Sequence, residues 1–351
     1  MSAKPVLLTM GDIARMAGVS ESTVSRALSG SPLVAEKTRT RILELAKTAG
    51  YSVNEQARNL ALKRTQTIEV IFPIERGTLQ QISDPFFLDM LAALTDELTA
   101  NGYDVLLSKS APWDEERPGC AFLGGRADGV IFVGQGRHKS KIRDFARTHK
   151  RVVVWGAADA DDDYCIVGSD NIRGAQMAVD HMIGLGRKSI AFLGDRSLTE
   201  IAQRYEGYKQ ALANAGLDVN DSLVLSTPFD IQKARDATTA LASLYPAFDA
   251  IFAASDMIAI ATIANLREAG IHVPEDVSVV GFDDIPAGAH VNPSLTTIHQ
   301  RIRHGGKLMV QKLLGIISGE EPKPEIIEAE LIVRQSCGSG RASLRPKSVE
   351  A

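Results

Sequence analysis

Cysteine and aromatic residues are scarce in this chain. Of its 351 residues, three are cysteines and 5% are aromatic. The cysteines, Cys120, Cys165 and Cys337, lie far apart in the sequence, so their spacing fits neither a disulfide framework nor a metal site. The seven histidines are also isolated from one another. We therefore expect no metal ion and a reducing, cytoplasmic environment.

Long apolar runs are also missing. No segment approaches the roughly 20 apolar residues that a helix needs to span a bilayer, and the first residues lack a signal-peptide pattern. An enzyme would need a nucleophile with a base, or a paired acid and base. The sequence contains no phosphate-cradling loop and no G-x-S-x-G motif. These absences argue against a membrane protein and an enzyme, and they predict no cofactor.

The charge of the chain is unevenly distributed. Residues 1–65 contain ten basic and five acidic side chains, a net charge of +5, whereas the whole chain carries −4. The remainder is therefore at −9. A length of 351 residues, with 44% apolar residues, allows more than one globular domain. A basic segment joined to a larger acidic domain is typical of a module that binds phosphate groups.

Residues 9–50 have the apolar spacing of three short helices. The first covers residues 12–17, and Gly18 ends it where the chain needs a positive φ. Ser20 is positioned to cap the second helix with its hydroxyl, and residues 35–48 predict a third helix that closes over the first two. The residues expected to face the shared core are Ile13, Met16, Ala17, Val24, Ala27, Leu28, Ile42, Leu43, Leu45 and Ala46.

The first two of these helices are joined by A-G-V-S, which is typical of a helix-turn-helix. In that motif the N-terminal end of the second helix, here Glu21, Ser22 and Thr23, enters the major groove of DNA. Two short helices around a glycine also occur in many helical domains, so the motif alone does not establish DNA binding. The third helix and the basic charge supply the context that favours it.

From residue 67 onward, short β-branched segments alternate with amphipathic helical ones. Strands that alternate with crossover helices predict parallel sheets covered on both faces, and the pattern occurs twice, which predicts two similar α/β subdomains. We expect buried strands at residues 67–72, 104–108, 129–133, 151–155, 189–194, 221–226, 250–253 and 277–282. We expect helices at residues 86–101, 140–148, 171–185, 201–215, 231–244 and 257–269.

Several sequence motifs are similar to those of one known family. The run L-T-M-G-D-I-A-R-M-A-G-V-S-E-S-T-V-S-R-A-L is followed by V-A-E-K-T-R and N-E-Q-A-R-N-L-A. Later segments are D-G-V-I-F-V-G, D-N-I-R-G-A, R-Y-E-G-Y, G-F-D-D-I-P and P-S-L-T-T-I. In order and spacing they resemble the LacI/GalR family of bacterial transcription regulators over nearly the whole chain. The resemblance implies a repressor of sugar uptake or catabolism genes.

The implied fold is a small all-α helix-turn-helix headpiece followed by two Rossmann-like parallel-sheet subdomains, arranged as in periplasmic binding proteins. We place the headpiece at residues 8–52, a hinge at 53–65, an effector-binding and dimerisation domain at 66–340 and a disordered tail at 341–351. The N-subdomain covers about 66–168 plus 298–320, and the C-subdomain about 169–297 plus 322–337. The resemblance implies crossings between them near residues 168–170, 297–299 and 320–324.

The hinge has few residues to bury, so alone it should be marginal as a helix and behave as a solvated linker. The resemblance implies instead that it becomes helical on operator DNA and inserts Leu60 into the minor groove. Val53 stands where the family often has proline, so the start of the hinge helix is less sharply defined. The predicted DNA-binding residues are Thr9, Ser20, Glu21, Ser22, Thr23, Ser25, Arg26, Ser29, Thr38, Asn54, Ala57, Arg58 and Leu60.

The cleft between two such subdomains is the expected ligand site, because ligands bind beyond the carboxyl ends of parallel strands. A small polyhydroxylated ligand needs flat apolar rings and charged hydrogen-bonding groups. Arg204 and Asp283 are favoured, since charged groups in a cleft are costly without a partner. The aromatic candidates have an alternative role in the core. The predicted effector-binding residues are Asp84, Phe86, Phe87, Trp155, Arg204, Phe229, Ser255 and Asp283.

Several alternatives stay open from the sequence. Ser255 stands where the family commonly has asparagine, which is consistent with a different ligand, and nucleobases or nucleosides compete with sugars as effector. Two other classes of protein are an enzyme acting on a sugar or nucleotide and a transport-type binding protein. The acidic run at residues 159–163 is expected to be a solvated loop. We expect a homodimer, because a palindromic operator requires two headpieces. We expect no tetramer built on a C-terminal coiled coil, because the tail has no heptad.

Overall fold

The computed structural model describes residues 8–28, 30–51, 64–74, 80–109, 111–114, 120–159, 162–321 and 323–339. The chain divides into two compact units, Met1–Thr65 and Gln66–Ala351, which we call the headpiece and the body. Within the described part of the chain, every helix is too short or too polar to span a bilayer.

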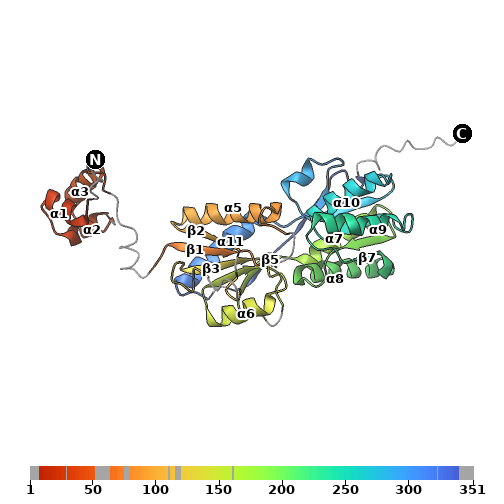
Figure 1. Ribbon diagram of the computed structural model, residues 1–351, viewed down its shortest axis with the longest axis horizontal. Coiled ribbons are helices and arrows are strands. Elements are labelled where there is room, and N and C mark those ends of the chain that lie inside the picture. The colour runs from red at the N-terminus through yellow and green to blue at the C-terminus, as the bar shows by residue number, and fades with distance from the viewer. Residues whose placement is uncertain are drawn as a thin grey trace, which may run out of the picture. The chain divides into compact units, whose positions relative to one another are not determined.

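The headpiece contains the three predicted helices, α1 (Met10–Ala17), α2 (Glu21–Leu28) and α3 (Glu36–Thr48) (Figure 1). Thr9 caps α1 through a capping box, in which its hydroxyl accepts the Asp12 N–H and its own N–H donates to the Asp12 carboxylate. Gly18 then adopts φ 65°, as predicted for the end of this helix. The Ser20 hydroxyl accepts the Thr23 N–H at 3.2 Å, so Ser20 caps α2 as predicted.

A small apolar core holds these helices together. It is built on Ile13, Val24 and Ile42, one from each helix, all fully buried. The prediction that Met16 and Leu43 also face this core is wrong, because 49% and 46% of their surfaces are exposed. The buried face of α1 is formed by Ile13, Ala14 and Ala17, which lie at positions i, i+1 and i+4 of the helix. Met16 lies outside this face.

The body contains two six-stranded sheets. The first has the strand order β11-β5-β4-β3-β1-β2, and all its strands are parallel. Its strands are β1 (Thr67–Ile71), β2 (Asp104–Ser108), β3 (Gly129–Val133), β4 (Val152–Trp155), β5 (Cys165–Ser169) and β11 (Glu325–Ile327). The second has the order β12-β10-β9-β8-β6-β7, parallel except for β12. Its strands are β6 (Ile190–Leu193), β7 (Val224–Leu225), β8 (Ala250–Ala253), β9 (Ser278–Asp283), β10 (Thr296–His299) and β12 (Glu330–Ile332).

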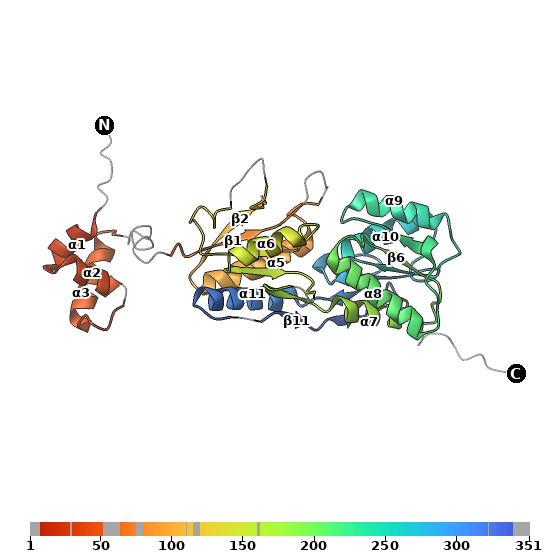
Figure 2. The same cartoon turned by 90° about the horizontal axis from the view of Figure 1, so that it is seen from below.

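Helices cover both faces of each sheet, as the alternating pattern predicts (Figures 1 and 2). On the first sheet, α5 (Pro85–Ala100) and α11 (Ile302–Ile317) pack on one face and α6 (Lys139–Thr148) on the other. On the second, α7 (Asn171–Gly184) and α8 (Thr199–Asn214) lie opposite α9 (Ile231–Ala242) and α10 (Asp256–Glu268). Two short 3₁₀ turns, η1 (Asp221–Leu223) and η2 (Pro286–Ala289), complete the second set. We call each sheet with its helices the first and the second lobe.

The chain passes between the lobes three times. After β5 it enters α7, and after β10 it enters α11, close to two of the predicted crossings. The third prediction, near residues 320–324, is wrong because β11 still pairs with β5 of the first lobe. The crossing lies between β11 and β12, two strands of three residues each that are too short to show a pattern.

The strand at residues 104–108 is present but not buried as predicted. It is β2, an edge strand paired only with β1, and Leu107 is 44% exposed. An edge strand has only one neighbouring strand, and its outer side is poorly covered. Its apolar residues look like those of a central strand in the sequence, but they are less buried.

Candidate functional site

The second headpiece helix presents polar side chains to solvent. Glu21, Ser22, Ser25 and Arg26 are exposed. The opposite face of α2 is buried in the core, so these four side chains share the outer surface. This arrangement leaves the predicted recognition helix free to enter a groove.

Other predicted DNA-binding residues have local roles as well. The side chains of Thr9 and Ser20 are caps of α1 and α2, and Thr38 is half-buried in α3. The end of the Glu21 side chain lies over Gly11, where an added Cβ would be 2.7 Å from its carboxylate oxygen. The predicted residues Ser29, Asn54, Ala57, Arg58 and Leu60 lie outside the described residues.

A cavity of about 570 Å³ lies between the two lobes of the body. It is found at the carboxyl ends of both sheets, where parallel α/β folds bind ligands. All eight residues predicted to bind the effector line it. The first lobe supplies Asp84, Phe86, Phe87 and Trp155, and the second lobe supplies Arg204, Phe229, Ser255 and Asp283.

Arg204 is a buried cation at the base of this cavity. Its Nε donates to Asn171 Oδ1 at 2.8 Å, and its Nη1 donates to the Ala254 carbonyl and lies 3.7 Å from Asp283 Oδ1. The guanidinium stacks over the Phe282 ring, with Cζ 3.7 Å from the ring centroid. Among the described residues Nη2 has no hydrogen-bond partner, so this amino group is available to a ligand.

Asp283 lies beside Arg204 at the end of β9. Burial raises the pKa of its carboxyl well above the usual range, the Arg204 cation opposes this, and the Asp256 and Asp84 carboxylates add to it. Gln300 Nε2 donates to Asp283 Oδ1 at 2.6 Å and fixes the carboxylate. The carboxyl is therefore an oriented group that can exchange hydrogen bonds with ligand hydroxyls.

The first lobe contributes the flat apolar surface. Phe86 and Trp155 have ring centroids 6.4 Å apart, whereas Phe87 packs at 4.9 Å against Phe72 of the core. Trp155 ends β4 and lies against α11 at Gly305, where an added Cβ would be 2.2 Å from the indole. The glycine is therefore needed for the indole to occupy this position.

Two of the predicted residues also start helices. Asp84 caps α5 by accepting the Phe86 N–H at 3.0 Å, and burial raises the pKa of this carboxyl. Ser255 caps α10 by accepting the Ile258 N–H at 3.3 Å. The cap uses one lone pair of the Ser255 hydroxyl, so its proton and its second lone pair remain for a ligand.

Sequence reasoning missed several residues of the cleft. Arg137 follows β3 and Asp195 follows β6, and their side chains form an ion pair of 3.0 Å between the lobes. Both residues follow the carboxyl end of a parallel strand, where ligands bind, and Asp283 was predicted from the same position. The sequence therefore contained the signal for them. Gln300 follows β10, a strand that the sequence pattern did not reveal. The remaining charged groups along the cavity are Glu200, Asp230 and Lys233.

The acidic run at residues 159–163 is solvated only in part. The side chains of Asp159 and Asp163 are each 49% exposed, as the sequence predicts for a solvated loop, but Asp162 differs. The side chain of Asp162 is only 2% exposed and lies 3.0 Å from Lys139 and 3.1 Å from Arg143 of α6. These ion pairs fix the loop after β4. That loop accepts a hydrogen bond from the second lobe, Gln203 Nε2 to the Ala158 carbonyl at 3.1 Å.

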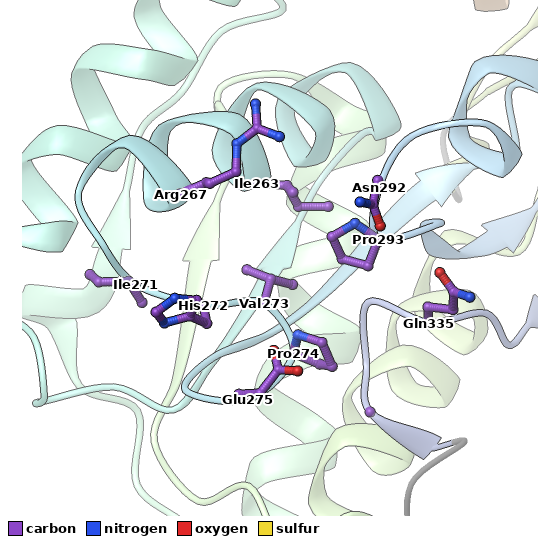
Figure 3. Close-up of a pocket in the computed structure, with 11 residues that line it drawn as sticks. Ile263, Arg267, Ile271, His272, Val273, Pro274, Glu275, Asn292, Pro293 and Gln335 are labelled. Atoms are coloured by element: carbon purple, nitrogen blue, oxygen red, sulfur yellow. The ribbon is translucent and has the colours of Figure 1, made fainter.

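A second cavity, of about 460 Å³, lies on the second lobe alone (Figure 3). Ile263, Val273, Pro274 and Pro293 group in its middle, and polar side chains surround them. Its cation, Arg267, is exposed, in contrast to the buried Arg204. The cavity between the lobes is the better candidate, since two of its charged groups, Arg204 and Asp283, are buried and since both lobes line it.

The comparisons with known proteins agree with this architecture. Residues 9–54 match the model for bacterial regulatory proteins of the lacI family, and residues 179–337 match a periplasmic binding protein-like domain. The HTH-type transcriptional regulator CelR of Thermobifida fusca is 30% identical, over 93% of this chain and 98% of that protein. The chain belongs to the LacI family. It is a DNA-binding transcription regulator.

One further relative and one solved structure support this assignment. The probable HTH-type transcriptional repressor ExuR of Bacillus subtilis is 32% identical, over 94% of this chain and 98% of that protein. The solved complex of CelR with cellobiose matches with 29% identity and a TM-score of 0.70, over 94% of this chain and 99% of that one. The names of these relatives describe transcription regulators.

Proposed function

We propose that this LacI-family regulator is a repressor whose affinity for a palindromic operator is switched by a small polyhydroxylated ligand, a mono- or disaccharide. The ligand binds between the lobes, and the target genes serve sugar uptake or catabolism. The observation that carries the proposal is the shared cavity, into which the second lobe presents Arg204 and Asp283 and the first lobe presents Phe86 and Trp155.

The chemistry of this cavity fits a sugar. Aromatic rings cover the C–H faces of a pyranose, and an oriented carboxyl exchanges hydrogen bonds with neighbouring hydroxyls. Here Phe86 and Trp155 supply the rings, Asp283 supplies the carboxyl, and Arg204 Nη2 supplies a free donor. The cellobiose bound by the related CelR supports this ligand class.

The switch follows from the two-lobe construction. A ligand can shift a two-state regulator only if it binds its two conformations unequally. Because the cavity walls belong to both lobes, a ligand contacts all of them only when the lobes are close. Closure would change how the first lobes of a dimer meet, and with it the approach of the two headpieces to DNA.

The headpiece supplies the DNA contacts in this proposal. Glu21 can accept from a cytosine amino group, and Arg26, about one turn further along α2, can donate twice to a guanine. A palindromic operator offers two equal half-sites, so a homodimer with two headpieces fits it. The hinge residues named from the sequence, including Leu60, are proposed to widen the minor groove between them.

A gel-shift assay with DNA from upstream of the chain's own gene tests the proposal. We expect retardation that a saccharide alters, and calorimetry against a panel of sugars, nucleobases and nucleosides identifies the ligand. Retardation that no member of the panel alters would refute the switch. Binding of a nucleobase, with no sugar bound, would contradict a sugar as the ligand but would leave the cavity between the lobes as the binding site.

A further inference from the structure

The turn after β9 has an unusual backbone. Asp283 has φ 128° and Asp284 has φ 60°, although neither is a glycine. Residues with a side chain rarely adopt positive φ, and φ near 128° belongs to a region used almost only by glycine. Such a turn persists only where its surroundings hold it. The turn carries Asp283 into the cavity, so whatever holds it also sets the position of that carboxyl.

A buried carboxylate, Asp256, binds this turn. Its Oδ2 accepts the Ile285 N–H at 2.9 Å, and its Oδ1 accepts the Thr297 hydroxyl at 2.5 Å. Ile285 comes directly after the two residues with positive φ, and Thr297 lies on the neighbouring strand β10. One side chain therefore connects the strained turn to the sheet.

The surroundings of Asp256 are shaped around this carboxylate. It is fully buried, and an added Cβ on Gly281 would lie 2.3 Å from its Oδ1. Burial raises the pKa of Asp256 to about 7, so placing a carboxylate here is unfavourable unless its hydrogen bonds compensate. Its place as the first residue of α10 adds the partial positive charge of a helix N-terminus.

We propose that Asp256 is a positioning residue of the ligand site, which holds the turn so that Asp283 faces the bound ligand. Asp256 is not among the residues that line the cavity, so it acts through Asp283. Gln300 fixes the side chain of Asp283, and Asp256 fixes the backbone that follows it. This assignment rests on the proposed function of the cleft.

Two substitutions remove the contact in different ways. Asp256→Asn keeps the shape but replaces one acceptor oxygen by a donor, and Thr297→Val removes the hydroxyl that donates to Asp256. Asp249→Asn is the matched control. Asp249 accepts the backbone N–H groups of Lys188 and Ser189, both at 2.9 Å, at the opposite end of the same sheet.

Two measurements on the full chain read the effect. Hydrogen–deuterium exchange, followed by mass spectrometry, reports the opening of residues 281–290, and calorimetry reports cellobiose binding. We expect Asp256→Asn to speed exchange in that segment and to weaken cellobiose binding roughly 10- to 100-fold. Thr297→Val should also speed exchange and weaken cellobiose binding, to a smaller extent. In the double variant, Thr297→Val should change the exchange and the affinity of Asp256→Asn little. Asp249→Asn should lower the melting temperature and leave both readings unchanged.

Faster exchange with unchanged cellobiose affinity would overturn the proposal, and so would unchanged exchange in the two variants. If Asp256→Asn does not fold, Thr297→Val decides by the same two readings. A parent protein that binds no cellobiose contradicts that ligand in the proposed function. The exchange comparison still decides in that case whether Asp256 holds the turn.

Discussion

Replacing Arg204 by alanine should abolish the response to ligand while leaving operator binding intact. The lost group is a buried guanidinium that lines the cavity, and its Nη2 has no hydrogen-bond partner within the described part of the chain. A hydrogen bond to a charged group contributes about 1.5–3 kcal/mol. Losing one such bond to the ligand therefore weakens binding by roughly 10- to 150-fold.

The same substitution should also destabilise the body. Asn171 Oδ1 and the Ala254 carbonyl lose their donor, and Asp283 loses its nearest cation. Breaking a buried pair costs about 3–5 kcal/mol. Since burial already raises the pKa of Asp283, its carboxyl can take up a proton and avoid an unpaired charge, so we expect the lower end of that range. Arg204→Lys keeps the charge and is the variant to use if the alanine protein unfolds.

The assay measures operator affinity by gel shift and ligand affinity by calorimetry, at a temperature where thermal unfolding shows the variants to be folded. Arg267→Ala is the control, because it removes the same charge from the second cavity on the same lobe. Titration of both Arg204 variants like the parent would refute the cleft as the site. Loss of the response in Arg267→Ala alone would move the site to the second cavity.

Four further predictions concern other parts of the chain. Glu21→Gln should change base preference at one symmetric pair of operator positions by about 1–3 kcal/mol, and an unchanged binding profile on randomised DNA would exclude Glu21 from base contact. Leu60→Ala should weaken specific DNA binding without loss of folding stability, whereas a loss of about 2–5 kcal/mol would show a core leucine. Burial raises the pKa of Asp256 to about 7 from 3.8, so the folded state holds this proton more tightly than the unfolded state. The proton therefore stabilises the fold at low pH, and this contribution is lost as pH rises to about 7. Urea unfolding should therefore show the free energy of unfolding of the parent falling, relative to that of Asp256→Asn, from about pH 4 to pH 7 and staying constant above. Arg137→Ala should remove the half-exposed ion pair with Asp195, which is worth no more than about 1 kcal/mol, and so shift the lobes slightly apart. A small increase of the radius of gyration in X-ray scattering without ligand would show this, and equal radii would contradict it.

The part of the cleft lining that lies at strand ends could be predicted because it depends on strand order. Asp283 ends a strand and Ser255 closely follows one, and both strands are apolar runs that can be recognised without knowing any partner. The carboxyl ends of parallel strands meet at one edge, so the rule identifies these residues from the sequence. Gln300 was missed only because β10, the strand before it, is short and polar in part.

The residues that hold the lining in place could not be predicted in this way. Asp256 contacts Ile285 and Thr297, which are 29 and 41 residues away, and no periodic pattern connects these positions. The same difficulty explains Asp162, which was expected in solvent. Its partners Lys139 and Arg143 appear in the sequence as charges on the polar face of α6, and only the fold brings that face against the loop after β4. A buried charge is costly without partners, so each of these carboxylates needs a partner from a distant segment. The periodic pattern of a sequence carries no information about such long-range contacts.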